Sequence, residues 1–431
     1  MLTNIGFAPP SGSTIADTPD VSFTYDAAGN RITMFDGSGT LSYFYDELSR
    51  LKKETKHFTD TLDDEPTGGY QLKYNYHLTG GLKSIEDPFG AIVTYNADKL
   101  GRTTAIGGSG FIEDSTETEI NSYIENINYR AFGGVKSMDY ATTASNQVLL
   151  DYNNNLQPSN YEVSSSANAG DTQNVTYSYF NDGSIKEAIN SVDSKFSQYY
   201  DYDFAGRLKR NEFGGSGSSQ PYKQTLVYDA FNQITGRSTW TWGTERSFTA
   251  SYTNNRPSAG GYQSGGNTYD TAGNIIQNVI NSRDSRSWKF DAAGRMVDWE
   301  EILPYVPYTV SAIDQGAEVT YDGDGRAVKQ LKRHRERING TVSWNYETDY
   351  QIYSSVLGQK ITTLDNTGKK NVTLVYMGSS VIAEQKVLTE GDRNLIAFKY
   401  TAPVTGSIEE TELSGEISTY LESFILKRSE Q

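Results

Sequence analysis

A short motif recurs along the chain: an aromatic residue and Asp, two variable residues, Gly, then Arg or Asn and an apolar residue. Self-similarity at such loose intervals is the signature of a repeat architecture. A chain of 431 residues also exceeds one comfortable hydrophobic core, so repetition of one unit explains its length best. Near-complete copies begin at Tyr25, Tyr45, Tyr202, Tyr269, Phe290 and Tyr321, and degenerate copies at Tyr76, Tyr95, Tyr129, Tyr152, Tyr179 and Tyr228.

Each motif position has a physical role. An Asp carboxylate accepts hydrogen bonds from backbone amides two residues on and so starts a turn. The Gly three residues later provides a left-handed backbone conformation without a Cβ penalty, so we expect positive φ there. Before the turn, Val21, Phe23 and Tyr25 alternate with polar residues, as in a strand with one covered face. The predicted structural turn residues are Tyr25, Asp26 and Gly29; Tyr202, Asp203 and Gly206; Tyr269, Asp270 and Gly273; Phe290, Asp291 and Gly294; and Tyr321, Asp322 and Gly325.

These patterns predict an all-β fold of repeated hairpins, more than half strand and with almost no helix. Only the tail from Ile417 to Lys427 can be interpreted as a short helix. Because sheet twist accumulates in one direction, a dozen hairpins in series should curl around a cavity or trough. Stability should be roughly a sum of local terms, so deletion of Tyr202 to Asn267 should leave a shorter folded object.

The pattern Tyr-Asp-x-x-Gly-Arg/Asn resembles the repeat of the RHS/YD family, which includes bacterial polymorphic-toxin shells, insecticidal toxin-complex cocoons and the teneurins. The resemblance covers about residues 20 to 385, and residues 350–385 are similar to the segment after the last repeats in bacterial members. It implies hairpins joined into a long spiralling sheet, a complete or partial hollow β shell. The expected segments are an irregular 1–20, a YD-repeat shell over 21–340, closing strands over 341–386 and a partly irregular C-terminal segment over 387–431.

Toxin carriers of that family close their shell with an Asp-Pro-x-Gly signature that includes an autoproteolytic site. Here the string occurs only at Asp87, Pro88, Phe89 and Gly90, between early repeats, where it suits an ordinary turn. No protease residue is therefore transferred to this chain.

Charge and composition limit the partners. The chain has 38 basic and 54 acidic residues and a net charge of -16, which argues against nucleic acid or an anionic membrane as the main partner. No stretch approaches the roughly 18 apolar residues of a membrane-spanning helix. The resemblance implies an extracellular or cell-surface location. Met1 to Pro19 has no basic residue before an apolar run, so for a secreted chain we expect either an export signal outside this sequence or an unconventional export route.

Recognisable catalytic, metal or cofactor chemistry is not expected. His57, His77 and His334 are the only histidines, and their spacing fits no metal motif. Asp322-Gly-Asp324-Gly lacks the third ligand position and the distal Glu of a calcium loop, which favours a repeat turn. A carboxylate pair for glycoside hydrolysis would leave no local signature, so that alternative stays open without nominated residues.

Two groups of residues could bind a glycan. Lys329, Lys332, Arg333, Arg335 and Arg337 form a basic run with His334. It could be a patch for an anionic ligand, with Lys332, Arg333, Arg335 and Arg337 at its centre, or a charged strand that resists aggregation. Exposed Trp side chains could stack on sugars, although core packing is the expectation for Trp240, Trp242, Trp288, Trp299 and Trp344. Glycosylation sequons occur at Asn174, Asn339 and Asn371.

Three classes of function remain. The first is a non-catalytic shell or scaffold segment of a larger secreted protein, which encloses or displays another domain or a cargo. The second is an extracellular glycan-binding or adhesion module, or a surface structure that self-associates through open sheet edges. The third is a glycan-active enzyme.

Overall fold

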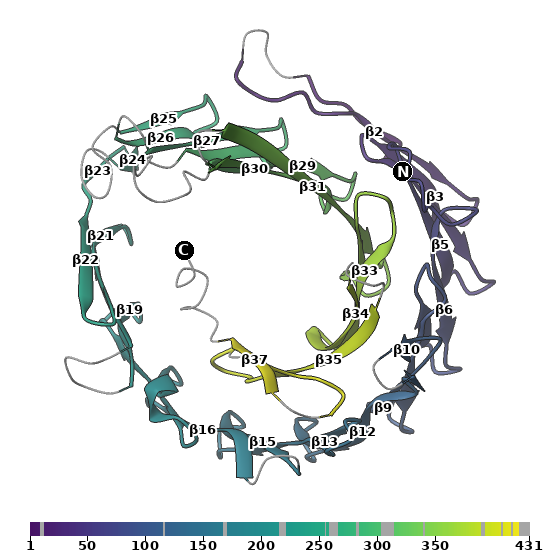
Figure 1. Cartoon of the computed structure of the whole chain (residues 1–431), viewed down its shortest axis with the longest axis horizontal. Coiled ribbons are helices and arrows are strands. Elements are labelled where there is room, and N and C mark those ends of the chain that lie inside the picture. Colours follow the sequence, from purple (N-terminus) through teal and green to yellow (C-terminus); the bar gives the residue numbers. More distant parts are fainter. Residues whose placement is uncertain are drawn as a thin grey trace. The chain divides into compact units, whose positions relative to one another are not determined.

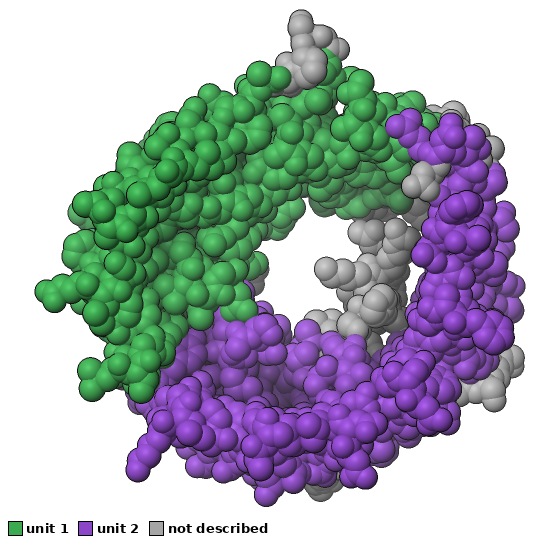
Figure 2. Space-filling view, turned by 180° about the vertical axis from the view of Figure 1, so that it is seen from behind, with its two compact units in different colours: residues 1–91, 257–373 green, residues 92–256, 374–431 purple. Residues whose placement is uncertain are grey.

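The computed structural model describes residues 1–8, 13–114, 117–166, 170–214, 221–254, 256–257, 266–281, 284–302, 314–338, 341–388, 393–406, 408–414 and 417–421. Two compact units make up the chain, and each combines two stretches that are distant in sequence. Unit 1 contains residues 1–91 and 257–373, and unit 2 contains residues 92–256 and 374–431 (Figure 2).

The predicted all-β fold of repeated hairpins in long antiparallel sheets is confirmed. Strands make up more than half of the chain, and the helical structure among the described residues is a three-residue 3-10 turn, η1 (Ser194–Phe196). None of the described helical structure is long and apolar enough to cross a membrane. The predicted helix at the tail is wrong over its first part, because Ile417–Leu421 forms strand β37 against β36; residues 422–427 lie outside the described residues.

Unit 1 is built of strands that each pair antiparallel with the next along the chain. Its first stretch carries β1 (Asn4–Ile5), β2 (Val21–Tyr25), β3 (Arg31–Asp36), β4 (Gly39–Tyr45), β5 (Leu51–Phe58), β6 (Tyr70–Tyr76) and β7 (Leu82–Glu86). Its second stretch carries β25 (Asn267–Tyr269), β26 (Ile275–Asn281), β27 (Asp284–Phe290), β28 (Met296–Ile302), β29 (Asp314–Tyr321), β30 (Ala327–Ile338), β31 (Thr341–Tyr353) and β32 (Lys360–Leu364) (Figure 1).

Unit 2 repeats this plan. Its first stretch carries β8 (Ile92–Ala97), β9 (Thr103–Ser109), β10 (Ile112–Glu113), β11 (Thr118–Glu119), β12 (Ser122–Tyr129), β13 (Val135–Tyr140), β14 (Gln147–Tyr152), β15 (Pro158–Ser165), β16 (Gly170–Tyr179), β17 (Ile185–Asn190), β18 (Gln198–Tyr202), β19 (Leu208–Phe213), β20 (Tyr222–Tyr228), β21 (Ile234–Thr241), β22 (Thr244–Thr249) and β23 (Tyr252–Thr253). Its second stretch carries β34 (Ser380–Leu388), β35 (Arg393–Thr401), β36 (Ile408–Thr411) and β37. The chain passes between the units three times: between Ala91 and Ile92, within β24 (Arg256–Pro257) and within β33 (Lys370–Met377).

The core of unit 1 lies between its two stretches. On β6, Tyr70, Leu72 and Tyr74 are buried while the alternate residues are not, as period-two patterning requires. Tyr74 donates a hydrogen bond of 2.8 Å to the hydroxyl oxygen of Ser354, 280 residues later in the chain. Phe58 packs on Tyr350 with ring centroids 4.8 Å apart. The strands of the first stretch are therefore covered on one face by strands of the second stretch.

Unit 2 has the same two-layered core. Tyr140 lies against Tyr400 with ring centroids 4.2 Å apart, and its hydroxyl donates to the carbonyl oxygen of Lys399 at 2.9 Å. The side-chain amide of Asn146, through Nδ2, donates to the Tyr400 hydroxyl at 2.9 Å. Tyrosine serves here because it supplies apolar area together with a hydroxyl that finds a partner when buried.

These contacts leave three predictions untested, and they stay predictions. They are the segment boundaries at residues 20, 340 and 386, the curling of the sheet around a cavity, and the folding of the chain after deletion of Tyr202 to Asn267.

Candidate functional site

The turn at Asp203 shows how the motif closes a hairpin. The amide of Asp203 donates to the carbonyl oxygen of Arg207 at 2.9 Å, and the amide of Gly206 donates to the carbonyl oxygen of Asp203 at 3.0 Å. Oδ1 of Asp203 accepts from the amides of Ala205 and Arg207 at 2.9 and 3.0 Å. One carboxylate oxygen thus satisfies two amides that the hairpin leaves without strand partners.

The other predicted turns share this backbone pattern. The amides that donate back to the Asp carbonyl belong to Gly29, Gly273, Gly294 and Gly325, for Asp26, Asp270, Asp291 and Asp322. These glycines and Gly206 have φ between 74° and 94°, the left-handed region that the sequence led us to expect. Degenerate copies place Ser49, Leu156 and Asn232 at the same position with φ of 58°, 61° and 66°, so the architecture tolerates a Cβ in some repeats.

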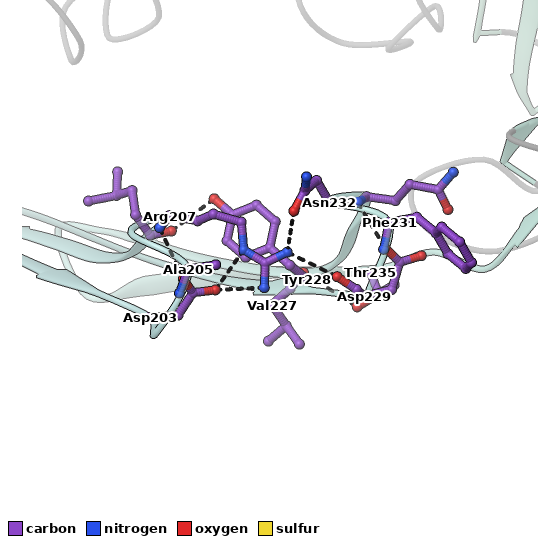
Figure 3. A network of polar contacts seen from close by, with 11 residues as sticks. Asp203, Ala205, Arg207, Val227, Tyr228, Asp229, Phe231, Asn232 and Thr235 are labelled. Carbon is purple, nitrogen blue, oxygen red and sulfur yellow. Dashed lines mark hydrogen bonds and ion pairs between the residues drawn. The ribbon is translucent and has the colours of Figure 1, made fainter.

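The Arg of the motif holds its own turn and contacts the next repeat (Figure 3). Nε of Arg207 donates to Oδ2 of Asp203 at 2.7 Å. The guanidinium lies 4.5 Å from the ring centroid of Tyr228, which opens the next repeat. Nη1 of Arg207 also donates to the carbonyl oxygen of Asp229 at 3.0 Å and to Oδ1 of Asn232 at 2.7 Å. One side chain therefore joins two successive turns.

The contact between Arg and the next tyrosine recurs along the chain. The guanidinium carbon lies 4.8 to 5.7 Å from the ring centroid in four further pairs, Arg50–Tyr76, Arg102–Tyr129, Arg295–Tyr321 and Arg326–Tyr353. Such cation–π contacts stabilise by about 0.5–1 kcal/mol when exposed.

Eight of the repeat tyrosines also cap the preceding repeat with their hydroxyl. Tyr228 donates at 2.8 Å to the carbonyl oxygen of Leu208, the residue that starts the strand after the previous turn. The same bond, at 2.7 to 3.0 Å, joins Tyr45 to Arg31, Tyr76 to Leu51, Tyr129 to Thr103, Tyr152 to Val135, Tyr179 to Pro158, Tyr252 to Ile234 and Tyr321 to Met296. We call the chain of Asp–Arg–Tyr contacts from repeat to repeat the repeat ladder. Sequence reasoning treated the tyrosine only as a strand end and missed this role.

The electrostatics of the ladder follow from these bonds. The hydrogen bond from the Arg207 amide, aided by the guanidinium, lowers the pKa of Asp203, and the same arrangement lowers the pKa of Asp46 and Asp98. Asp322 differs because burial raises its pKa. The turn carboxylates are thus held as hydrogen-bond acceptors in most repeats.

The two candidate signatures found in the sequence are repeat turns. In Asp322-Gly-Asp324-Gly, Oδ1 of Asp322 accepts from the amides of Asp324 and Arg326, and the carboxylate of Asp324 pairs with Arg31 at 2.7 Å for each oxygen. In Asp-Pro-Phe-Gly, Oδ1 of Asp87 accepts from the amides of Phe89 and Ala91 at 2.9 Å.

Asp87 does more than form its turn. Its Oδ2 accepts from Nζ of Lys370 at 2.7 Å and from the hydroxyl of Thr373 at 2.8 Å, both in the later stretch of unit 1. With Arg31–Asp324, this buried contact fastens the two layers of the unit at a repeat turn.

The basic run lies on β30, and carboxylates of the same unit already engage much of it. Lys329 pairs with Asp60 at 2.7 Å and Lys332 with Asp349 at 2.6 Å. Arg333 pairs with Glu318 at 3.0 Å and also with Asp298. Arg335 lies 5.3 Å from the ring centroid of Trp344, and the side chain of Arg337 lies outside the described residues. An anionic ligand would have to displace these partners, and the patch stays a prediction.

The expected core packing of the tryptophans is wrong for three of them. Trp240, Trp242 and Trp344 are exposed to 39%, 64% and 43%. Trp240 is the penultimate residue of β21, and no residue of β21 or β22 is buried, so neither strand offers a covered face for a large ring. Trp288 and Trp299 are half-buried and lie directly opposite each other on β27 and β28.

The remaining candidates have local structural roles. Nδ1 of His57 lies 2.8 Å from Oε1 of Glu65, and the amide of His77 closes a repeat turn by donating to Gly81. His334 lies on β30. The sequons at Asn174 and Asn371 fall on β16 and β33, and Asn339 lies outside the described residues.

Comparison with known proteins supports the fold. No protein-family model matches the chain, and no curated protein matches it. A crystal structure of TcdB2-TccC3 matches 92% of this chain with a TM-score of 0.56 at 13% identity, and this chain spans 21% of that chain. TcdB2-TccC3 without its hypervariable C-terminal region matches with a TM-score of 0.48 at 12% identity, covering 93% of this chain and 23% of that one. A Photorhabdus luminescens Tc holotoxin pore matches with a TM-score of 0.40 at 13% identity, covering 93% and 26%.

Proposed function

We propose that this chain is a segment of an RHS/YD-type β shell and that it belongs to a larger extracellular or cell-surface assembly. Its role is structural: it encloses or displays another part of that assembly, and it carries no catalysis of its own. The repeat ladder is the observation that carries this proposal.

The ladder supports a scaffold role because the motif residues bind one another and hold successive repeats together. Asp203 is bonded to its own turn, Arg207 to two turns, and Tyr228 to the preceding strand. The fold match to TcdB2-TccC3 over 92% of the chain supports the same view, and the 21% coverage of that chain fits a segment of a larger structure.

Protection from proteolysis tests the shell. The polypeptide should be isolated as its host produces it, together with any associated protein, and digested under native conditions. In the wild-type preparation, we expect a second segment of the polypeptide or an associated protein to resist digestion. A Gly206→Val/Gly294→Val variant, which strains two repeat turns, should release it. Phe35→Gln serves as the control, because Phe35 is exposed on β3 away from the repeat turns. Equal digestion in all three proteins would refute enclosure.

Glycan binding is the second candidate, favoured by one feature of β31. Trp344 and Tyr346 are exposed and stacked, with ring centroids 6.4 Å apart, and Arg335 lies over Trp344. Aromatic faces of this kind suit sugar rings. Binding to a glycan array that disappears in Trp344→Ala would support this function, and release of reducing sugars from the same glycans would point to an enzyme.

A further inference from the structure

The tips of the repeat turns in unit 2 carry a row of large apolar side chains. Successive strands are antiparallel, so every second connection lies at the same end of the sheet. The six turns at that end each expose one Leu or Phe. These side chains, which we call the apolar rim, are Leu100 at 78% exposure, Phe132 at 46%, Leu156 at 56%, Phe180 at 36%, Phe204 at 113% and Phe231 at 82%.

The turn itself does not require these residues. Two turns of unit 1, at Asp270 and Asp291, close with Ala272 and Ala293 in the variable positions, whereas the turns at Asp46 and His77 expose Leu48 and Leu78. Figure 3 shows the ring of Phe231 pointing away from Arg207 and Tyr228, so it takes no part in the repeat ladder. Leaving a phenyl ring in water forgoes the free energy of burying it. The rings of Phe132 and Phe180 each also touch a tyrosine of the following repeat edge-on, Tyr152 at 5.0 Å and Tyr202 at 6.1 Å between ring centroids. The other tips, and the exposed parts of these two rings, are better explained by a contact outside the chain than by the stability of the hairpins.

We propose that the apolar rim is a contact surface for a second copy of this chain, which docks rim to rim. The tips follow one another at about twice the strand spacing, or roughly 9.5 Å, so the rim of a second copy has the same period and its tips fit between those of the first. Such an isologous contact is self-complementary, as in most homodimers.

The charge of the rim permits this contact although the chain carries a net charge of -16. The six turns hold equal numbers of basic and acidic residues: Lys99, Arg102, Arg130 and Arg207, and Asp98, Asp182, Asp203 and Asp229. Two of the acids pair with bases in their own turns, Asp98 with Arg102 and Asp203 with Arg207, each at 2.7 Å. Like copies therefore meet without net repulsion along the rim.

The area is also sufficient. Burying a Leu or Phe side chain removes on the order of 60–120 Å² of apolar surface, so six tips remove about 360–720 Å² from each copy. Interfaces are about 60% apolar, which gives a total of about 600–1,200 Å² per copy. A stable interface buries about 800 Å² per partner.

Sedimentation velocity of the full chain over a wide range of concentrations tests the proposal. We expect the wild type to dimerise and Phe204→Gln/Phe231→Gln to be monomeric, with a Kd at least about a hundredfold higher, because each lost ring counts twice in the dimer. Leu100→Gln/Phe132→Gln is a second, independent variant. Phe35→Gln/Phe44→Gln is the matched control, since both rings are exposed on β3 and β4 but lie outside the rim. Circular dichroism verifies that each protein is folded.

Three outcomes overturn the proposal: a monomeric wild type at all concentrations, a dimer that both rim variants retain, and a dimer that only the control variant loses. Flotation with phosphatidylcholine and phosphatidylglycerol vesicles forms a further arm. Vesicle binding that is lost in the rim variants, without dimerisation of the wild type, would assign the rim to a lipid surface instead. None of these outcomes changes the shell proposal, which rests on the ladder and is tested by proteolysis.

Discussion

Glu409 on β36 is a buried carboxyl group that should make the stability of unit 2 depend on pH. Its side chain is 0% exposed, and neither carboxylate oxygen has a hydrogen-bond partner among the described residues. The nearby hydroxyl of Thr172 donates to the carbonyl oxygen of Val163 instead. Burial raises the pKa of Glu409 to about 7, from an ordinary value of 4.5. The folded unit therefore holds this group as the neutral acid over a range where the unfolded chain ionises it.

The sign and size follow from linkage. The folded pKa is raised, so the stabilising contribution is fully present below pH 4.5 and is lost as the pH rises to about 7. The two pKa values differ by about 2.5, and each unit of pH is worth about 1.4 kcal/mol, so the loss is about 3 kcal/mol. Glu409→Gln removes this dependence because an amide does not ionise. Burying the glutamine amide costs the same free energy at every pH, so this cost does not change the shape of the pH profile.

Urea unfolding between pH 4.5 and 8, followed by circular dichroism, measures the effect as a difference between wild type and variant. We expect the free energy of unfolding of Glu409→Gln, relative to wild type, to rise by about 3 kcal/mol across this range. Glu412→Gln is the control, because Glu412 is exposed in the same stretch, and its difference from wild type should stay constant. Parallel pH profiles for wild type and Glu409→Gln would refute the reasoning.

The remaining predictions concern the repeat ladder. Gly294→Val should destabilise the protein by at least about 1–2 kcal/mol in urea unfolding, since φ is +74° there, and an unchanged unfolding midpoint would contradict the turn account. Tyr228→Phe should cost about 0.5–1.5 kcal/mol through the lost bond to Leu208, whereas Tyr346→Phe, at an exposed site, should cost nothing measurable. Asp203 has a lowered pKa, so its contribution is present above its unfolded pKa and is lost as the pH falls. Asp203→Asn should keep the turn, as Asn153 does, but flatten the acid limb of the stability profile; an unaltered acid limb would show that the carboxylate charge is unimportant.

Much of the fold was predictable because the repeat turn is closed by residues next to one another in sequence. Asp203, Gly206 and Arg207 satisfy each other's backbone groups within five residues, so the motif by itself identifies the hairpin. The same locality explains why Asp87-Pro-Phe-Gly was predicted to form an ordinary turn. The contact from Arg207 to Tyr228 spans two repeats, and only the periodic recurrence of Arg and Tyr could have suggested it.

The sequence by itself determined the strands, the hairpin turns and the positive φ of the motif glycines, since backbone hydrogen bonding and sterics decide these over a few residues. Tertiary structure alone decided which faces are covered. Tyr74 is buried because Ser354, 280 residues away, packs on it, whereas Trp240 is exposed on β21, a strand with no buried residue. The same long-range packing enclosed Glu409 without a hydrogen-bond partner and left Phe204 at a turn tip in water. Period-two patterning shows that a strand has two faces, but which face meets another layer depends on contacts between residues hundreds of positions apart.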